Sequence, residues 1–130
     1  MSADVPAAVL ERLTAAPLKA FDSPPPANTV YPYVVVYFDS APRSSDREAD
    51  MRVTRDHGWQ TTVVGNNAAQ VRAALERVTA ALSDWRPDVA GRSCHKVEHD
   101  GSQPTRPDPA MPDRTLYIAT DQWRVVSDPL

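Results

Sequence analysis

The sequence has 130 residues, which is enough for one domain with an ordinary apolar core that needs neither disulfides nor a metal. Hydrophobic residues make up 42%, and the formal net charge is −3, from 14 basic and 17 acidic residues. Domains that bind nucleic acids usually carry a basic surplus, so this balance argues against a protein that grips DNA or RNA. Cys94 is the single cysteine, and no apolar run approaches the ~20 residues of a membrane helix, so we expect a soluble protein made in a cytoplasm.

The first predicted element is a helix from Val5 to Ala15. Asp4 is a suitable N-cap, and Pro6 falls in the first turn, where a missing N–H is tolerated. Pro17 disfavours helix at the preceding residue and marks the end. Four apolar residues share one face at helical spacing: Val5, Val9, Leu10 and Leu13.

Two strands are predicted before the next helix. After a proline-rich loop over Phe21–Thr29, the segment Val30–Asp39 is β-branched and aromatic with apolar residues on both faces, which predicts a strand inside the sheet and covered on both sides. Ser40–Asp50 is polar and of mixed charge, and we expect a long loop there. Met51–Val64 predicts a strand or strand pair, with a bend at residues 56–58.

The strongest helical pattern follows Gly65. Asn67, with Gln70 three residues later, is a capping-box pattern, and Pro87 marks the end. Leu75 stands at the centre of a stripe that predicts a helix of about five turns. The stripe contains Val71, Ala74, Leu75, Val78, Ala81, Leu82 and Trp85.

The rest of the chain predicts a weak edge strand over Arg92–His99, a loop with four prolines over Asp100–Pro112, and a last strand over Thr115–Val126. The predicted order is therefore α-β-β-α-β-β. We expect one α+β domain over residues 1–130, with two helices packed on one mostly antiparallel sheet of four to five strands, and long loops.

Candidate catalytic and metal sites are weak. Cys94, His95 and His99 are ligand types, but alternation on a strand turns the first two to opposite faces and separates the two histidines by ~13 Å, so we expect no metal. No GxSxG turn is present for a nucleophile. The turn from Val64 to Asn67 resembles an anion-binding turn but is better explained as a capped turn, so we expect no cofactor and no catalytic residues.

Protein contacts are a better prediction. Trp59 and Trp123 lie on strands, where each is explained equally well as core or as interface. Arg43, Arg47 and Asp50 lie in the mixed-charge loop, a type of segment that fixes register between subunits. These five residues are the candidate subunit contacts.

The order of elements then resembles a known family. An N-terminal helix leads through a proline-rich loop to Tyr31–Tyr37, a long loop follows, and Gln60–Gly65 precedes the helix Ala69–Val78, which closes near Asp84–Pro87. This pattern is similar to the tail terminator proteins of long-tailed bacteriophages, of the lambda minor tail protein U type. Because Lys19 and Lys96 are the two lysines among 14 basic residues, the composition is typical of a GC-rich genome and favours an actinobacterial phage.

The resemblance implies a structural virion protein at the head–tail joint, assembled in the host cytoplasm. It implies a homohexameric ring that caps the tail tube, contacts the major tail tube protein and joins the head–tail connector or neck proteins, while DNA passes through the lumen without specific binding. No catalytic residues belong to such a family. The alternatives are another neck or minor tail subunit and, from a different class, a small cytoplasmic enzyme or ligand-binding α+β domain.

Overall fold

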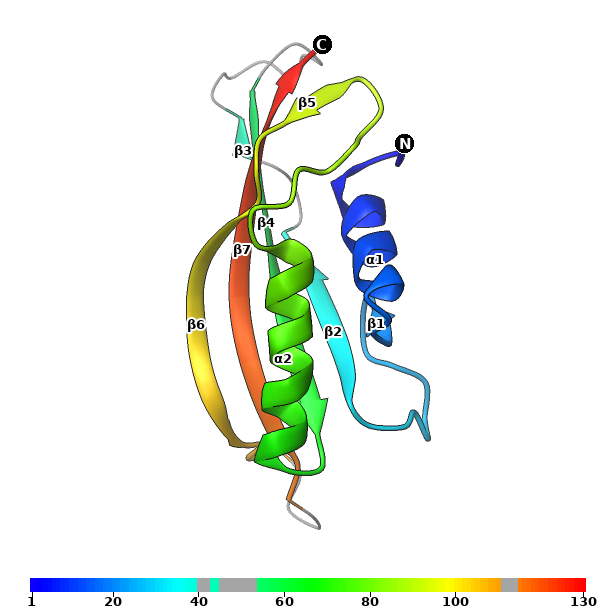
Figure 1. Cartoon of the computed structure of the whole chain (residues 1–130), viewed down its shortest axis with the longest axis vertical. Helices are drawn as coiled ribbons and strands as arrows, with labels where there is room; N and C mark the ends of the chain where they lie inside the picture. Colours follow the sequence, from blue (N-terminus) through cyan, green and yellow to red (C-terminus); the bar gives the residue numbers. More distant parts are fainter. Residues whose placement is uncertain (40–42, 45–53, 111–114) are drawn as a thin grey trace.

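The protein is a two-layer α+β structure in which two helices lie on the same side of a seven-stranded mixed sheet (Figure 1). The computed structural model describes residues 1–39, 43–44, 54–110 and 115–130, with only the backbone at 43–44. The strands are β1 (Ala20–Phe21), β2 (Tyr33–Phe38), β3 (Arg43–Ser44), β4 (Arg55–Gly65), β5 (Arg92–Cys94), β6 (Glu98–Pro107) and β7 (Tyr117–Pro129).

The strands follow the spatial order β1-β2-β4-β7-β5, while β3 also pairs with β4 and β6 also pairs with β7. β1 runs parallel to β2, and the other pairs of strands are antiparallel. The sheet is therefore mixed and larger than the predicted four to five strands. The centre is the ladder between β4 and β7, which extends from the pair Arg55–Ser127 to the pair Gly65–Tyr117.

Both helices begin where the sequence predicts. Helix α1 spans Val5–Ala15, and the Asp4 carboxylate accepts a hydrogen bond from the Ala7 N–H at 2.9 Å. Helix α2 spans Ala68–Leu82, and the Asn67 side chain accepts from the Gln70 N–H at 2.8 Å. The Gln70 side chain accepts in return from the N–H of Asn66, one residue before the cap. These bonds satisfy amides that have no partner inside the helices.

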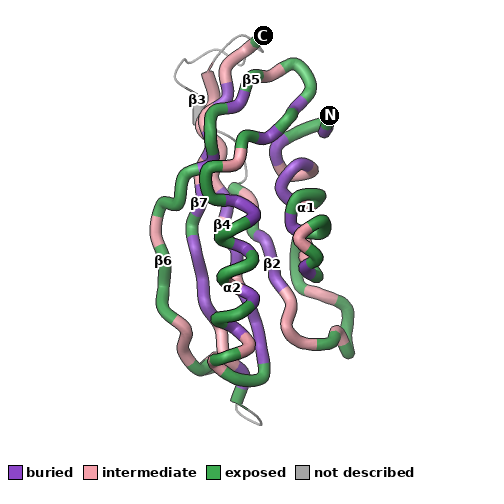
Figure 2. Tube along the Cα trace, in the orientation of Figure 1, coloured by how far each residue is buried: buried purple, intermediate pink, exposed green. Residues whose placement is uncertain are grey.

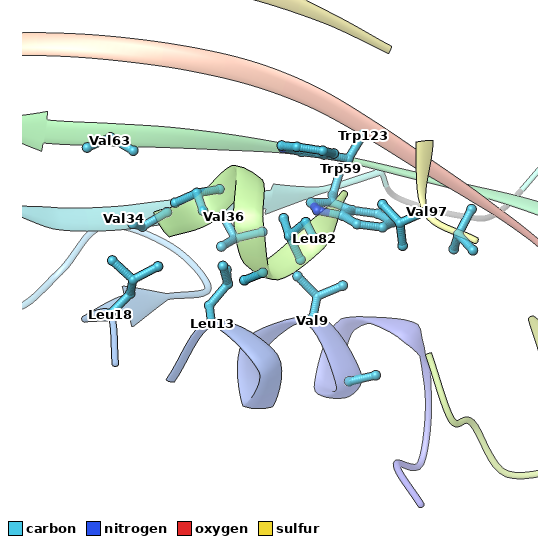
Figure 3. Close-up of a cluster of buried hydrophobic side chains, with 14 of the residues drawn as sticks. Val9, Leu13, Leu18, Val34, Val36, Trp59, Val63, Leu82, Val97 and Trp123 are labelled. Carbon is cyan, nitrogen blue, oxygen red and sulfur yellow. The ribbon is translucent and has the colours of Figure 1, made fainter. Parts of the chain in front are cut away.

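The apolar core fills the space between the helices and one face of the sheet (Figure 3). Val34, Val36 and Val63 project from the sheet toward α1 and α2, because alternate residues of a strand point to the same face. The helices and their flanks contribute Val9, Leu13, Leu18, Val71, Val78 and Leu82. Leu75 is only half-buried and packs at the margin, so Val78 rather than Leu75 is the buried centre of the α2 stripe.

Three predictions about the strands were wrong. Residues 100–107 are not loop but part of β6, which is mostly exposed (Figure 2) and pairs with β7 through two irregularities. Residues 56–58 do not bend, because β4 is continuous from Arg55 to Gly65. The strand β2 does lie inside the sheet, between β1 and β4, but both helices cover the same face of it.

Neither α1 nor α2 is long and apolar enough to cross a membrane, and no other described segment is such a helix.

Candidate interaction surface

The sheet face opposite the helices, here called the outer face, has the character of a contact surface. Register and alternation assign to it Tyr33, Val35 and Tyr37 on β2, Gln60, Thr62 and Val64 on β4, and Ile118, Thr120, Gln122 and Arg124 on β7. Its middle is uncharged and rich in amides and hydroxyls, and Thr62 and Thr120 lie 3.2 Å apart between their Oγ1 atoms. Tyr37 is 47% exposed. A large aromatic side chain left open in this way is typical of protein contacts.

A polar hollow of about 330 Å³ lies at one end of this face. Three carboxylates and one guanidinium line it, together with two glutamines, Gly58 and parts of two tryptophans. The lining residues are Asp39, Asp56, Gly58, Trp59, Gln60, Asp100, Gln122, Trp123 and Arg124. We call this region the acidic hollow, because its carboxylates outnumber its cation.

The Arg124 guanidinium is already engaged. Its Nη2 lies 2.9 Å from the Asp56 carboxylate, and its Nε lies 3.9 Å from that of Glu98. Asp39 and Asp100 form no ion pair or side-chain hydrogen bond within the described part of the chain. The Asp39 carboxylate lies against the Cα of Gly58, where a Cβ would meet it directly, so glycine is what lets it approach the sheet. Among the described residues, the carboxylates of the hollow therefore outnumber its cation.

A second polar cluster lies on the helix side and fastens β6 to the sheet. The Nε2 of His99 lies 2.8 Å from the Oδ1 of Asp121, and the His99 ring packs on Trp123 with centroids 4.9 Å apart. Asp121 is only 4% exposed, and its Oδ2 has no partner among the described residues. Nearby, the Trp123 Nε1 donates to Thr61 Oγ1 at 3.0 Å. Charged and polar anchors thus replace the apolar contacts that β6 lacks.

A third cluster surrounds the end of β7. His57 lies 3.1 Å from Ser127 Oγ, and burial, followed by the charges of Arg92 and Arg55, holds the pKa of His57 below its ordinary value. The Asp128 carboxylate has a lowered pKa because Thr54 and then His95 hydrogen-bond to it, each at 2.6 Å. These contacts tie the end of β7 to β4 and to the segment that follows β5.

The outer surface of α2 carries a shallow, open depression of about 500 Å³, formed by side chains of this helix alone and here called the α2 groove. It is lined by Arg72, Leu75, Glu76, Thr79 and Ala80. Arg72 and Glu76 make no hydrogen bond or ion pair with described residues, in contrast to Arg12 and Arg77, which donate to backbone carbonyls across the two helices. The groove therefore combines apolar atoms with an unengaged charge of each sign.

The residues singled out from the sequence fall in different places. Trp59 and Trp123 are 2% and 1% exposed, so both belong to the hydrophobic core (Figure 3). Arg43 contributes backbone to β3, while Arg47 and Asp50 lie outside the described residues. Sequence reasoning missed the acidic hollow. Its one local signal is Gly58 inside a strand, which often marks a close approach.

The residues considered as metal ligands have separate neighbours. Cys94 is buried in the core, and burial raises the pKa of its thiol, whereas His95 pairs with Asp128 and His99 with Asp121. Within residues 1–39, 54–110 and 115–130, no group of three or more His, Cys, Asp or Glu side chains is placed to hold a metal ion.

Comparison with known proteins decides the family. Residues 5–118 match the family described as tail completion protein gp17, and this range includes both helices and six of the seven strands up to the start of β7. The chain belongs to that family. No curated protein matches the sequence.

Among solved structures, a chain in the virion of a native gene transfer agent particle has the same fold. Its TM-score is 0.68 at 17% identity, and the alignment covers 94% of this chain and 92% of that chain. Membership of the tail completion family confirms the predicted phage tail protein and gives this chain a structural role in the tail. The closer likeness to the lambda minor tail protein U and an actinobacterial source stay predictions.

Proposed function

We propose that the protein is a tail terminator: a closed homomeric ring of six subunits that caps the tail tube, ends its polymerisation and presents a surface to the head-completion or connector proteins. Membership of the tail completion family over residues 5–118 is the observation that carries this proposal.

The two-layer architecture supports a ring. The outer face and the α2 groove lie on opposite sides of the molecule and differ in shape and charge. A contact between two different surfaces of identical subunits propagates in one direction, and it stops when the rotation closes on itself. Arg43, Arg47 and Asp50 remain proposed contact residues. The net charge of −3 fits a lumen through which DNA passes without being held.

The acidic hollow also bears on the rival function, a small ligand-binding domain, because it gathers several polar side chains. Ligand pockets, however, are mostly apolar and enclose the ligand, whereas the hollow is an acidic depression at one end of the outer face. The family assignment also favours structural assembly over ligand binding. No cofactor and no reaction are proposed.

The test is to delete the gene from the phage that encodes it and to complement it with the intact chain. Without the protein, we expect tails of uncontrolled length, or tails that fail to join heads, in electron micrographs. With it, native mass measurement of isolated tails is expected to show six copies at one end. Tails of normal length that join heads in the deletion strain would refute the proposal.

A further inference from the structure

We infer that the outer face of one subunit docks on the α2 groove of a second copy, with Tyr37 entering the groove and Arg72 lying beside the acidic hollow. This inference rests on the proposed ring and names the contact that would build it.

On the sheet side, an exposed aromatic ring lies beside the acidic hollow. Tyr37 stands 47% exposed on β2, and its cross-strand neighbour Gln60 lines the acidic hollow. Asp39 lies two residues further along the chain, about 7 Å away at strand rise. Asp39 and Asp100 are the two carboxylates of the hollow that no described cation neutralises. An exposed aromatic ring next to carboxylates that have no cationic partner among the described residues favours a partner with an apolar groove next to a cation.

On the helix side, the α2 groove offers that combination. Leu75 and Ala80 supply apolar atoms, and the small side chain of Thr79 lies beside them. The Arg72 guanidinium has no hydrogen-bonding partner in the described part of the chain. Arg72 and Thr79 lie seven residues apart, about 10 Å along the helix axis. The separation of about 7 Å between Tyr37 and Asp39 falls within this length, so one docking pose brings the Tyr37 ring onto the groove and Arg72 toward the hollow.

The charges also set the direction of the contact. The hollow is lined by three carboxylates and one guanidinium, so it attracts Arg72 and repels Glu76, which also lines the groove. Complementary charges of this kind fix orientation and rate of association more than they add affinity. Replacing Glu76 with a basic residue is therefore expected to strengthen the contact rather than weaken it.

A charge-reversal cycle on the full chain tests the contact. The readout is the protein concentration at half-assembly, by native mass spectrometry or sedimentation. Asp100→Arg and Arg72→Glu are each expected to raise it roughly tenfold, the double variant to restore it toward that of the unchanged chain, and Glu76→Arg to lower it. Arg86→Glu, at an exposed residue beyond α2, is the matched control and is expected to change nothing.

Cross-linking between engineered cysteines is an independent test of the same contact. Cys94, the only natural cysteine, is 3% exposed and does not compete. With a short thiol cross-linker, Tyr37→Cys and Thr79→Cys together are expected to give a ladder of covalent oligomers that ends at the ring size. Each variant alone is expected to give monomers, because the two positions meet only across a heterologous contact.

The outcomes separate this inference from the proposed function. If rings form but the reversals have no effect, or the double variant does not recover, this pairing is wrong while the ring stands. Cross-links from a single cysteine would overturn it as well, since they indicate like faces in contact. If the unchanged chain is a monomer both in solution and in isolated tails, the ring is refuted and the contact with it.

Discussion

At the residue scale, His57 couples the fold to pH. Because its folded pKa lies below the ordinary 6.5, the folded protein favours the neutral imidazole. As pH falls below about 6.5, the unfolded chain takes up a proton that the folded chain resists, so the free energy of unfolding decreases until the lower folded pKa is reached. Above pH 6.5 this contribution is fully present.

The measurement is urea unfolding at a series of pH values between 8 and 5. His57→Gln, which keeps a hydrogen-bonding side chain near Ser127, is expected to lose part of the decrease below pH 6.5. Asp128 does not confuse the result, because its lowered pKa affects stability only as pH falls below its ordinary 3.8. An identical pH profile for both proteins would contradict this role for His57.

The buried Asp121 carboxylate depends on its hydrogen bond with His99. We expect His99→Ala to decrease the free energy of unfolding by about 1–3 kcal/mol, because it leaves a carboxylate that is 4% exposed without its hydrogen bond. Glu98→Ala, next to it on β6 and 69% exposed, is expected to change little.

A double-mutant cycle separates the pair from the contact of His99 with Trp123. Replacing both His99 and Asp121 with alanine is expected to cost less than the sum of the single changes, because the buried charge is removed with its partner. Strict additivity would show that the two side chains do not stabilise each other.

At the scale of the element, α2 is held by its buried stripe. Val78 is fully buried, so Val78→Asp is expected to abolish folding, since an unpaired buried carboxylate costs several kcal/mol out of a total of about 5–15 kcal/mol. Leu75→Asp is expected to fold with lowered thermal stability, because the half-buried side chain reaches solvent through the α2 groove.

Circular dichroism and thermal melting of the two purified variants provide the comparison. A folded Val78→Asp protein beside an unfolded Leu75→Asp protein would mean that α2 presents a different face to the sheet. From the stripe alone, Leu75 at its centre would be the more damaging position for Asp. The structure instead makes Val78 the more damaging position, because Val78 is the more deeply buried of the two side chains.

Strand β6 shows where sequence patterns stop being informative. Glu98–Pro107 contains a glycine, two prolines and no apolar alternation, so nothing local predicts that a strand continues beyond His99. The strand exists because β7 offers a long edge and His99 supplies an anchor, and edge position tolerates proline. In contrast, the helices are fixed by local caps and periodicity, and their starts at Val5 and Ala68 agree with the caps at Asp4 and Asn67.

At the scale of the whole molecule, the α+β class and the two helices on one sheet were predictable from the sequence, because apolar periodicity reports which surfaces must be buried. The acidic hollow was not, since Asp39, Asp56 and Asp100 come from different segments and meet only through the pairing of β2, β4, β6 and β7. Short strands such as β1 were also missed, because two residues carry no periodic signal.

The position of β7 has a consequence for how the protein is made. It pairs with β4 on one side and with both β5 and β6 on the other, yet it follows all of these strands in the sequence. Until Tyr117–Pro129 emerges, β4 lacks its longest ladder, and the β2–β4 pair has no neighbour on that side. The described sheet is therefore completed only after β7 has been made, when β4 gains its longest ladder and β5 and β6 gain the strand with which they pair.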